Sequence, residues 1–289
     1  MKIARYLHAN RIGFGIVDND RIVAITPGTR SPAATDPFTA LLAALASHAL
    51  PETAGWGRSG EPTLPIEQVR LLAPVERPGK IIGVGRNYVD HASEMAVETP
   101  DVPKIFFKWP GSVIGHRDEI RHTSAIRQLD YEVEIAVVIG KAARNVPRSE
   151  AARHIAGLTI VNDVSERAIQ MMPKSGSTSL AKSLDTFCPM GPWLVTLDEV
   201  GSLDDIALEC RVNDELVQRG HSGQMIFPIP VLIEYLSQYI TLEPGDVIAT
   251  GTPSGVGMYR DPPLWLKPGD RIRMDVGGIG TLQNQVVAG

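Results

Sequence analysis

Short runs in which hydrophobic and polar residues alternate mark the first quarter of the chain. These runs cover residues 2–7, 11–17 and 21–25, and the polar turn Asp18-Asn19-Asp20 joins the last two. Alternation with a period of two residues is typical of β-strands that bury one face. We therefore expect a small antiparallel meander at the start of the chain.

A single helix is expected after the meander. Asp36 is a good N-cap residue and Pro37 suits the first helical turn. Four hydrophobic residues follow at helical spacing: Phe38, Leu41, Leu42 and Leu45. Prolines and glycines then gather at residues 73–79, which is typical of a boundary. We predict a small N-terminal α/β domain at residues 1–74 and a larger domain at residues 75–289.

Short strands dominate the pattern of the larger domain. We expect them at residues 105–108, 131–139, 158–161, 193–195, 206–212, 247–249, 271–276 and 281–287. Hairpin turns are expected at Asn213-Asp214 and Gly277-Gly278. Helices near residues 149–155 and 230–239 are subsidiary. The predicted fold class is α+β and rich in β-structure.

Two glutamates interrupt the strand-like run at residues 131–139. Glu132 and Glu134 lie two residues apart, so their side chains project from the same face of a strand. Two carboxylates on a mostly apolar strand repel each other and are costly to desolvate unless a cation lies between them. The alternative is an edge strand with a solvated acidic face.

A third carboxylate, Asp163, ends the apolar run at residues 157–162. Its alternative role is to cap a helix expected at residues 165–171, and the two roles are compatible. Three carboxylates form a hard oxygen site suited to Mg²⁺, Mn²⁺ or Ca²⁺. Zinc fits less well, because the sequence has no His-x-x-His or Cys-x-x-Cys pair.

A histidine and a glutamate follow the glycine-rich stretch Gly83-Val84-Gly85. His91 and Glu94 are three residues apart, which makes them neighbours on one face of a helix. A carboxylate beside an imidazole fixes its tautomer and raises its basicity, so the pair suits proton transfer near neutral pH. The alternative is an ordinary surface contact. A dinucleotide site is excluded because Tyr88 occupies the third glycine position of that motif.

A second glycine-rich stretch covers residues 251–257. It is not a phosphate loop, because no Lys-Ser or Lys-Thr follows. Its glycines allow close approach of the backbone, and Thr252 adds a hydroxyl, so a small carboxylate is a reasonable ligand. The alternative is a tight turn built from turn-forming residues.

Five ordered motifs between Lys80 and the C-terminus resemble the fumarylacetoacetate hydrolase family. They are Gly-x-Gly-Arg-Asn-Tyr-x-x-His-x-x-Glu, Asp-Tyr-Glu-x-Glu, Asn162-Asp163-Val164-Ser165-Glu166-Arg167, Lys182-Ser183-x-Asp185-Thr186-Phe187, and Gly245 to Pro253. The resemblance implies a mixed β-roll catalytic domain. It also implies metal ligands at Glu132, Glu134 and Asp163, a catalytic dyad of His91 and Glu94, an active-site lysine at Lys182, and substrate contacts from Arg167, Gln170 and Thr252.

The resemblance leads to a predicted reaction. We expect Mg²⁺ or Mn²⁺ to chelate a 2,4-dioxo acid, either acylpyruvate-like or derived from a sugar, while His91 directs water at the C4 carbonyl. Cleavage of the C3–C4 bond would release pyruvate and a carboxylic acid. The alternative is a decarboxylase, or an isomerase or hydratase, that acts on a 2-oxo acid through a metal-bound enolate. The shared motifs do not separate these activities.

Composition limits the partners and the location. The chain has 289 residues, 43% of them hydrophobic, and a net charge of −5, which argues against nucleic acid as a partner. Two unpatterned cysteines and no apolar run long enough to span a membrane favour the cytoplasm. The apolar run at residues 225–233 exceeds what one amphipathic helix needs, so we expect part of it to form a homodimer interface.

Overall fold

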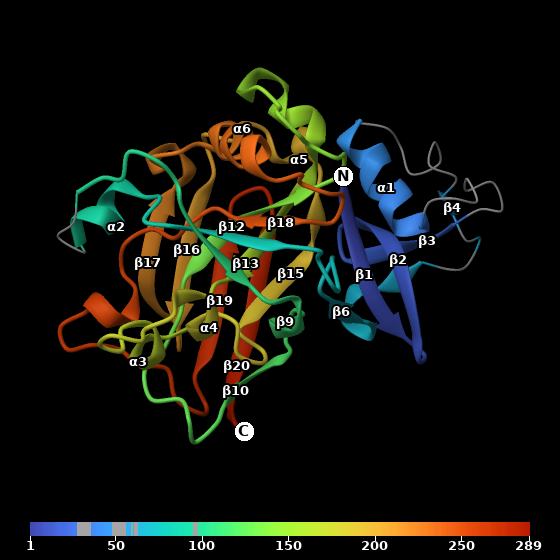
Figure 1. Ribbon diagram of the computed structural model, residues 1–289. Coiled ribbons are helices and arrows are strands. Elements are labelled where there is room, and N and C mark those ends of the chain that lie inside the picture. The colour runs from blue at the N-terminus through green and yellow to red at the C-terminus, as the bar shows by residue number, and fades with distance from the viewer. Residues whose placement is uncertain (28–35, 48–55, 59, 61–62, 95–97) are drawn as a thin grey trace.

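The structure is a computed structural model that describes residues 1–27, 36–47, 56–58, 60, 63–94 and 98–289. Most of its regular elements are strands, which form two large sheets and one short ribbon (Figure 1). Both parallel and antiparallel pairs occur. The predicted α+β, β-rich class and the mixed sheet are therefore confirmed.

The N-terminal strands pair in sequence order. Strand β1 (Lys2–His8) is antiparallel to β2 (Arg11–Asp18), which is antiparallel to β3 (Arg21–Pro27). Helix α1 (Pro37–Ala46) begins after Asp36, whose carboxylate accepts a hydrogen bond from the Thr39 amide at 2.9 Å. Three short strands complete this part: β4 (Trp56–Arg58), β5 (Leu64–Pro65) and β6 (Arg70–Leu72).

The larger sheet runs across the predicted domain boundary. Its order is β4-β3-β2-β1-β15-β13-β12-β18-β7-β8, and β1 joins β15 through the pairs Lys2↔Val195 and Ile3↔Leu194. Its later strands are β7 (Ile81–Gly85), β8 (Lys104–Lys108), β9 (Val113–Ile114), β12 (Val133–Ile139), β13 (Ile155–Asn162), β15 (Cys188–Val195) and β18 (Val247–Ala249). The division at residue 74 stays a prediction.

A second sheet has the order β10-β20-β19-β16-β17. Its strands are β10 (Glu119–His122), β16 (Ala207–Val212), β17 (Glu215–His221), β19 (Arg271–Val276) and β20 (Gly280–Ala288). Asn213 and Asp214, between β16 and β17, have φ values of 50° and 71°, as a tight hairpin turn requires. A short ribbon pairs β11 (Leu129–Asp130) with β14 (Ser165–Glu166).

Helices are few and mostly short. Besides α1, the described residues form α2 (Val89–Glu94), α3 (Arg167–Gln170), α4 (Thr178–Ala181), α5 (Leu197–Val200) and α6 (Ile229–Tyr239). Short 3₁₀ helices occur at Ile66–Gln68, Pro110–Ser112, Arg148–His154, Ser222–Gln224 and Gly257–Tyr259. The helix expected at residues 165–171 begins only at Arg167, because Ser165 and Glu166 pair with β11. Its N-cap is Glu166, so the predicted capping role of Asp163 is wrong.

Strand β12 separates two hydrophobic cores. Val133, Ile135, Val137 and Ile139 face the larger core, which also contains the second sheet and α6. Ala136 and Val138 face the other way, into a core closed by α1. Glu132 and Glu134 share this second face by strand alternation. The acidic pair therefore lies where the apolar face of β12 ends.

The apolar run at residues 225–233 packs into the larger core. Met225, Ile229, Leu232 and Ile233 are all buried within the chain itself. Ile226, Phe227 and Val231 of the same run remain partly exposed, so the expectation that part of it forms a homodimer interface stays a prediction. Among the described residues, no helix is long and apolar enough to cross a membrane.

Candidate active site

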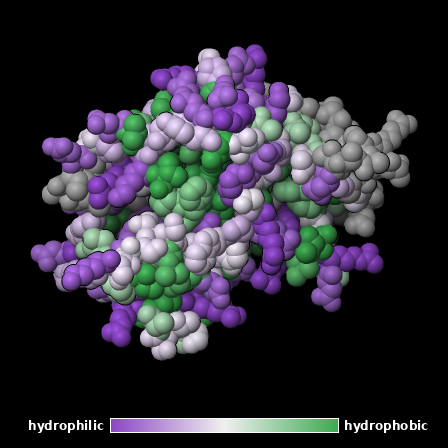
Figure 2. Space-filling model, in the orientation of Figure 1, coloured by the Kyte–Doolittle hydropathy of each residue, from purple (hydrophilic) through white to green (hydrophobic). Residues whose placement is uncertain are grey.

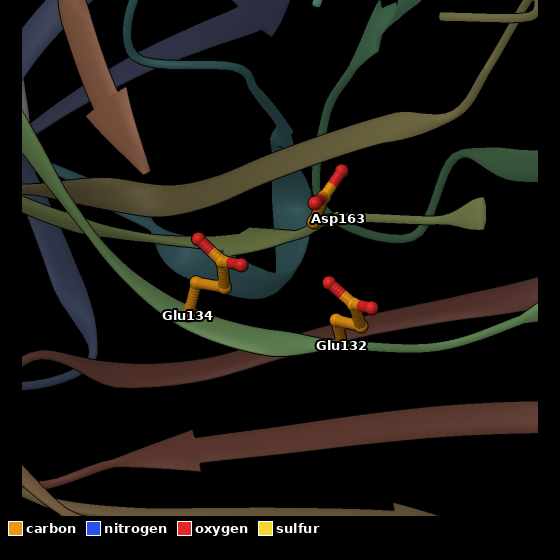
Figure 3. A group of neighbouring side chains, drawn as sticks. All are labelled: Glu132, Glu134 and Asp163. Atoms are coloured by element: carbon orange, nitrogen blue, oxygen red, sulfur yellow. The ribbon is translucent and has the colours of Figure 1, made fainter. Parts of the chain in front are cut away.

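Three carboxylates from neighbouring strands face a common space (Figure 3). Glu134 lies in β12, Glu132 directly precedes that strand, and Asp163 directly follows β13. One oxygen of each lies within 4.8 Å of the others, and all three residues are buried. The backbone explains this, because the Asp163 amide donates to the Glu132 carbonyl at 2.9 Å and so continues the pairing of the two strands.

Buried cations surround the carboxylates. The Lys182 ammonium donates to Glu132 Oε2 at 2.8 Å and also to Asp163 Oδ2. Lys108 donates to Asp163 Oδ1 at 2.7 Å, and the Arg167 guanidinium contacts Glu132 Oε1 at 2.5 Å. These contacts bring the predicted active-site lysine and the predicted arginine into direct contact with the acidic cluster.

The buried cations neutralise the charges of the three carboxylates to different extents. Burial alone would raise the pKa of Glu132, but the charges of Lys182 and Arg167 outweigh burial and lower it. Burial raises the pKa of Glu134 well above its usual range, and the charges of Asp163 and Glu132 raise it further. Glu134 accepts a hydrogen bond from the Gly251 amide at 2.9 Å, but no cation pairs with it among the described residues. Its charge is the least compensated of the three.

This donor set fits a hard divalent cation. Its oxygens are all carboxylate oxygens, which Mg²⁺, Mn²⁺ and Ca²⁺ prefer, and they are close enough to share one ion. A dication among Glu132, Glu134 and Asp163 would relieve the repulsion that raises the pKa of Glu134. The residues therefore fit the predicted metal site, although they do not identify the metal.

The predicted dyad is formed and well anchored. His91 Nδ1 lies 2.9 Å from Glu94 Oε2 across one turn of α2, and the imidazole is almost completely buried. Glu94 Oε1 accepts a hydrogen bond from the Gly255 amide at 2.9 Å. Since Nδ1 is engaged by the carboxylate, Nε2 is the ring nitrogen left to exchange a proton with another group.

Two glycines allow the loop after β18 to hold both groups. Gly251 has a φ of +100° and donates to Glu134, and a Cβ there would lie 2.8 Å from Asn87 Cβ. Gly255 has a φ of +99°, and its Cβ would lie 2.1 Å from the Val217 carbonyl oxygen. Only glycine fits these positions without strain. The stretch is therefore a turn that donates amides to Glu134 and Glu94.

The candidate substrate contacts line the same cavity. Its volume is about 290 Å³, and Arg167, Gln170 and Thr252 lie in its wall with His91, Lys182 and two of the carboxylates. Arg167 is committed to Asp130 at 2.9 Å and to Glu132, and it donates to Gln170 at 2.8 Å. The guanidinium of Arg167 thus holds Glu132 in place.

Thr252 is also occupied by protein groups. Its hydroxyl donates to the Val133 carbonyl at 2.9 Å and accepts from Gln218 Nε2 at 2.8 Å. Gln218 is buried, and its Oε1 accepts a hydrogen bond from the Val133 amide at 3.0 Å. Sequence reasoning missed Gln218 because a single glutamine in an alternating strand carries no signal. The buried position of Lys108 was not predicted either, because a lysine at the end of an apolar strand is usually exposed on the surface.

Comparison with known proteins identifies the family. The family model described as fumarylacetoacetate (FAA) hydrolase C-terminal matches residues 80–287. The chain belongs to the fumarylacetoacetate hydrolase family. A second family model, described as Rv2993c-like, N-terminal, matches residues 1–74 of this family member.

Two curated relatives carry the name of an isomerising enzyme. Oxaloacetate tautomerase YisK of Bacillus subtilis is 48% identical over 225 residues, which is 76% of this chain and 74% of the relative. The human mitochondrial oxaloacetate tautomerase FAHD2A is 46% identical over 226 residues, 78% of this chain and 72% of the relative. A solved 5-carboxymethyl-2-hydroxymuconate delta-isomerase from Mycobacterium smegmatis has a TM-score of 0.79 and 35% identity, with full coverage of both chains.

These relatives correct the predicted reaction. Hydrolysis of the C–C bond of a 2,4-dioxo acid is wrong as the main interpretation, and the alternative, an isomerase of a 2-oxo acid, is favoured. The motifs misled us for a chemical reason. A cluster of three carboxylates, a His–Glu pair and a lysine can serve any reaction that passes through an enolate, whether or not a C–C bond is cleaved.

Proposed function

We propose that this fumarylacetoacetate hydrolase family member is a tautomerase, which interconverts the enol and keto forms of oxaloacetate or a closely similar 2-oxo acid. The observation that carries the proposal is 46–48% identity to two oxaloacetate tautomerases over about three quarters of the chain. The site supports it, because His91, Lys182 and two of the three carboxylates line a single cavity.

Glu132, Glu134 and Asp163 would hold Mg²⁺ or Mn²⁺. When bound, the ion supplies positive charge that orients the substrate carboxylate and 2-oxygen and acidifies the C3–H bond. Tautomerisation has no net proton change, so a single group can carry the proton. His91 Nε2 takes the C3 proton of the keto form and returns it to the 2-oxygen, and the reverse path runs from enol to keto.

The neighbours of His91 make this transfer favourable. Glu94, bonded to Nδ1 at 2.9 Å, stabilises the imidazolium while it carries the proton. Burial would lower the pKa of Lys182, but the charges of Asp163 and Glu132 outweigh burial and raise it, so its ammonium stays protonated. That ammonium lies on the cavity wall, where it stabilises negative charge on the 2-oxygen.

The test is a tautomerisation assay on the purified protein. Enol-oxaloacetate is added with Mg²⁺ or Mn²⁺, and the decay of its ultraviolet absorbance is compared with the uncatalysed rate. We expect faster decay that EDTA abolishes, with no matching release of pyruvate. Pyruvate formed at the rate of enol decay would indicate decarboxylation instead, and no acceleration with either metal would reject the proposal.

The assembly and the location belong to the same proposal. We propose a homodimer that uses exposed apolar side chains on and just after β8, on α4 and just after α3, namely Phe107, Trp109, Met171, Met172 and Leu180. Figure 2 shows hydrophobic residues gathered over α3 and α4. Such patches mark interaction surfaces. The expected cytoplasmic location stays a prediction, and the only ligand the proposal requires besides the metal is a small 2-oxo acid.

A further inference from the structure

Two cations lie side by side in the wall of the active-site cavity. Arg86 directly follows β7, and Lys104 begins β8, the last strand of the larger sheet. Gly85 pairs with Lys104 across these strands, so the lysine stem lies over the glycine, with Cδ 3.9 Å from the position of a Cβ. Both side chains line the cavity that contains His91 and Lys182.

Neither cation has an acidic partner among the residues that the structure describes. The ion pairs found there join other groups, and within the same residues the Arg86 and Lys104 side chains make no hydrogen bond. Burial lowers the pKa of Lys104, and the charge of Arg86 lowers it further. Arg86 is half-buried and Lys104 is exposed at the mouth of the cavity, and an anion bound between the two like charges would relieve their repulsion.

The other cations of the cavity are already neutralised. Lys182 is bonded to Glu132 and Asp163, and Arg167 is bonded to Asp130 and Glu132. The cavity therefore has an end where acids and cations balance and an end where positive charge is in excess. Arg86 also has a φ of +60°, a conformation that is unfavourable for a non-glycine residue and that often marks a functional position.

We propose that Lys104, with Arg86, binds the second carboxylate of a 2-oxo dicarboxylic acid and so selects dianionic over monoanionic substrates. The inference rests on the proposed function, since it assumes that the 2-oxo acid group lies at the carboxylate cluster. The distal carboxylate then reaches the cationic end of the same 290 Å³ cavity. Lys104 acts as a specificity determinant and takes no part in proton transfer.

A pair of unreactive ligands isolates the distal carboxylate. Malate and lactate share a carboxylate with a hydroxyl on the adjacent carbon, and only malate has a second carboxylate. Their dissociation constants are measured by NMR titration of the Mg²⁺-loaded protein. Because Lys104 is exposed and its charge is screened by solvent, we expect a preference for malate of only about fivefold.

Three variants test the assignment. Lys104→Gln should abolish the preference by weakening malate binding while lactate binding stays within about twofold of the wild type. Lys104→Arg should keep it, and Lys267→Gln, which removes an exposed positive charge elsewhere, should leave it unchanged. The proposal is overturned if the wild-type protein does not prefer malate, if it fails to bind malate, or if Lys104→Gln retains the preference.

The outcome is separable from that of the tautomerisation assay. A preference for malate that depends on Lys104, in a protein that does not accelerate enol decay, would keep the binding site and reject the reaction. Fast tautomerisation of oxaloacetate without any role for Lys104 in malate binding would keep the reaction and reject the binding site.

Discussion

Lys108 and Asp163 form an ion pair in which neither side chain has any exposed surface. The Lys108 ammonium lies 2.7 Å from Asp163 Oδ1, and it also donates to the Lys182 carbonyl. The ammonium of Lys182 binds the other oxygen of Asp163. One carboxylate is therefore held by two lysines, and this arrangement ties β8 to β13 and to the segment after α4.

Replacing Lys108 with Met should destabilise the protein strongly. The change leaves the Asp163 charge buried beside one cation where there had been two, and removing one partner of a buried pair typically costs about 3–5 kcal/mol. Urea unfolding of the metal-free protein should show this loss, and Lys141→Met, at an exposed position, should show almost none. Equal unfolding midpoints for the two variants would contradict the structural role of Lys108.

Replacing Glu134 with Gln should separate metal binding from folding. The variant removes one charge from the crowded cluster, so the metal-free protein should be as stable as the wild type or slightly more stable. Affinity for Mn²⁺ should fall by about tenfold or more, because a charged oxygen ligand is lost. Calorimetric titration with Mn²⁺ checks the affinity, and undiminished binding would remove Glu134 from the ligand set.

Replacing His91 with Asn should slow tautomerisation by about 10²- to 10⁴-fold, the usual contribution of a positioned proton carrier. Mn²⁺ affinity should be unchanged, because the His91 ring is hydrogen-bonded to Glu94 and not to any of the three carboxylates of the cluster. Glu94→Gln should cause a smaller loss, since the imidazole keeps its place but loses stabilisation of its protonated form. A His91→Asn variant that tautomerises oxaloacetate at the wild-type rate would show that His91 does not carry the proton.

Strand periodicity made the carboxylate cluster predictable. Glu132 and Glu134 had to share a face once the run up to Ile139 was a strand, and Asp163 came at the end of the next strand-like run. The register of β12 against β13, with Val133 opposite Asn162, then brings Asp163 beside Glu132. Local pattern sufficed here because the two strands are sequential neighbours in the sheet.

The parts that depend on distant segments were not predictable from one sequence. Lys108 is buried only because segments 55 and 74 residues away provide Asp163 and the Lys182 carbonyl. Arg167 was expected to contact substrate, yet its guanidinium binds Asp130 and Glu132, which no spacing rule indicates. The pairing of β1 with β15 is likewise a long-range contact, set by side-chain packing rather than by local pattern.

Both cysteines should be inert in the folded protein. Burial raises the pKa of the Cys188 thiol to about 12 and raises that of Cys210 well above its usual range. The thiolate is the reactive form, so at about pH 8 a disulfide reagent such as DTNB should not react with the native protein and should titrate two thiols in denaturant. Rapid reaction of the native protein would show that one cysteine becomes exposed.

His116 should make the protein less stable as the pH falls from about 6.5 to 4. Burial, and then the charge of Arg117, lower the pKa of His116 to about 4, although Asp118 opposes them. Its Nδ1 accepts a hydrogen bond from the Gln283 amide at 3.2 Å, which requires the unprotonated nitrogen.

The sign of the effect follows from proton binding. Between the two pKa values the unfolded chain binds a proton at this site and the folded chain does not, so the free energy of unfolding rises with pH in that window. Because His116 is partly solvent-exposed, we expect a contribution of about 1–2 kcal/mol between pH 7 and pH 4.5. Urea unfolding of His116→Asn should lack this component, whereas His122→Asn, a substitution on the neighbouring strand β10, should keep it. Identical pH profiles for the wild type and His116→Asn would show that the folded protein protonates His116 as readily as the unfolded chain does.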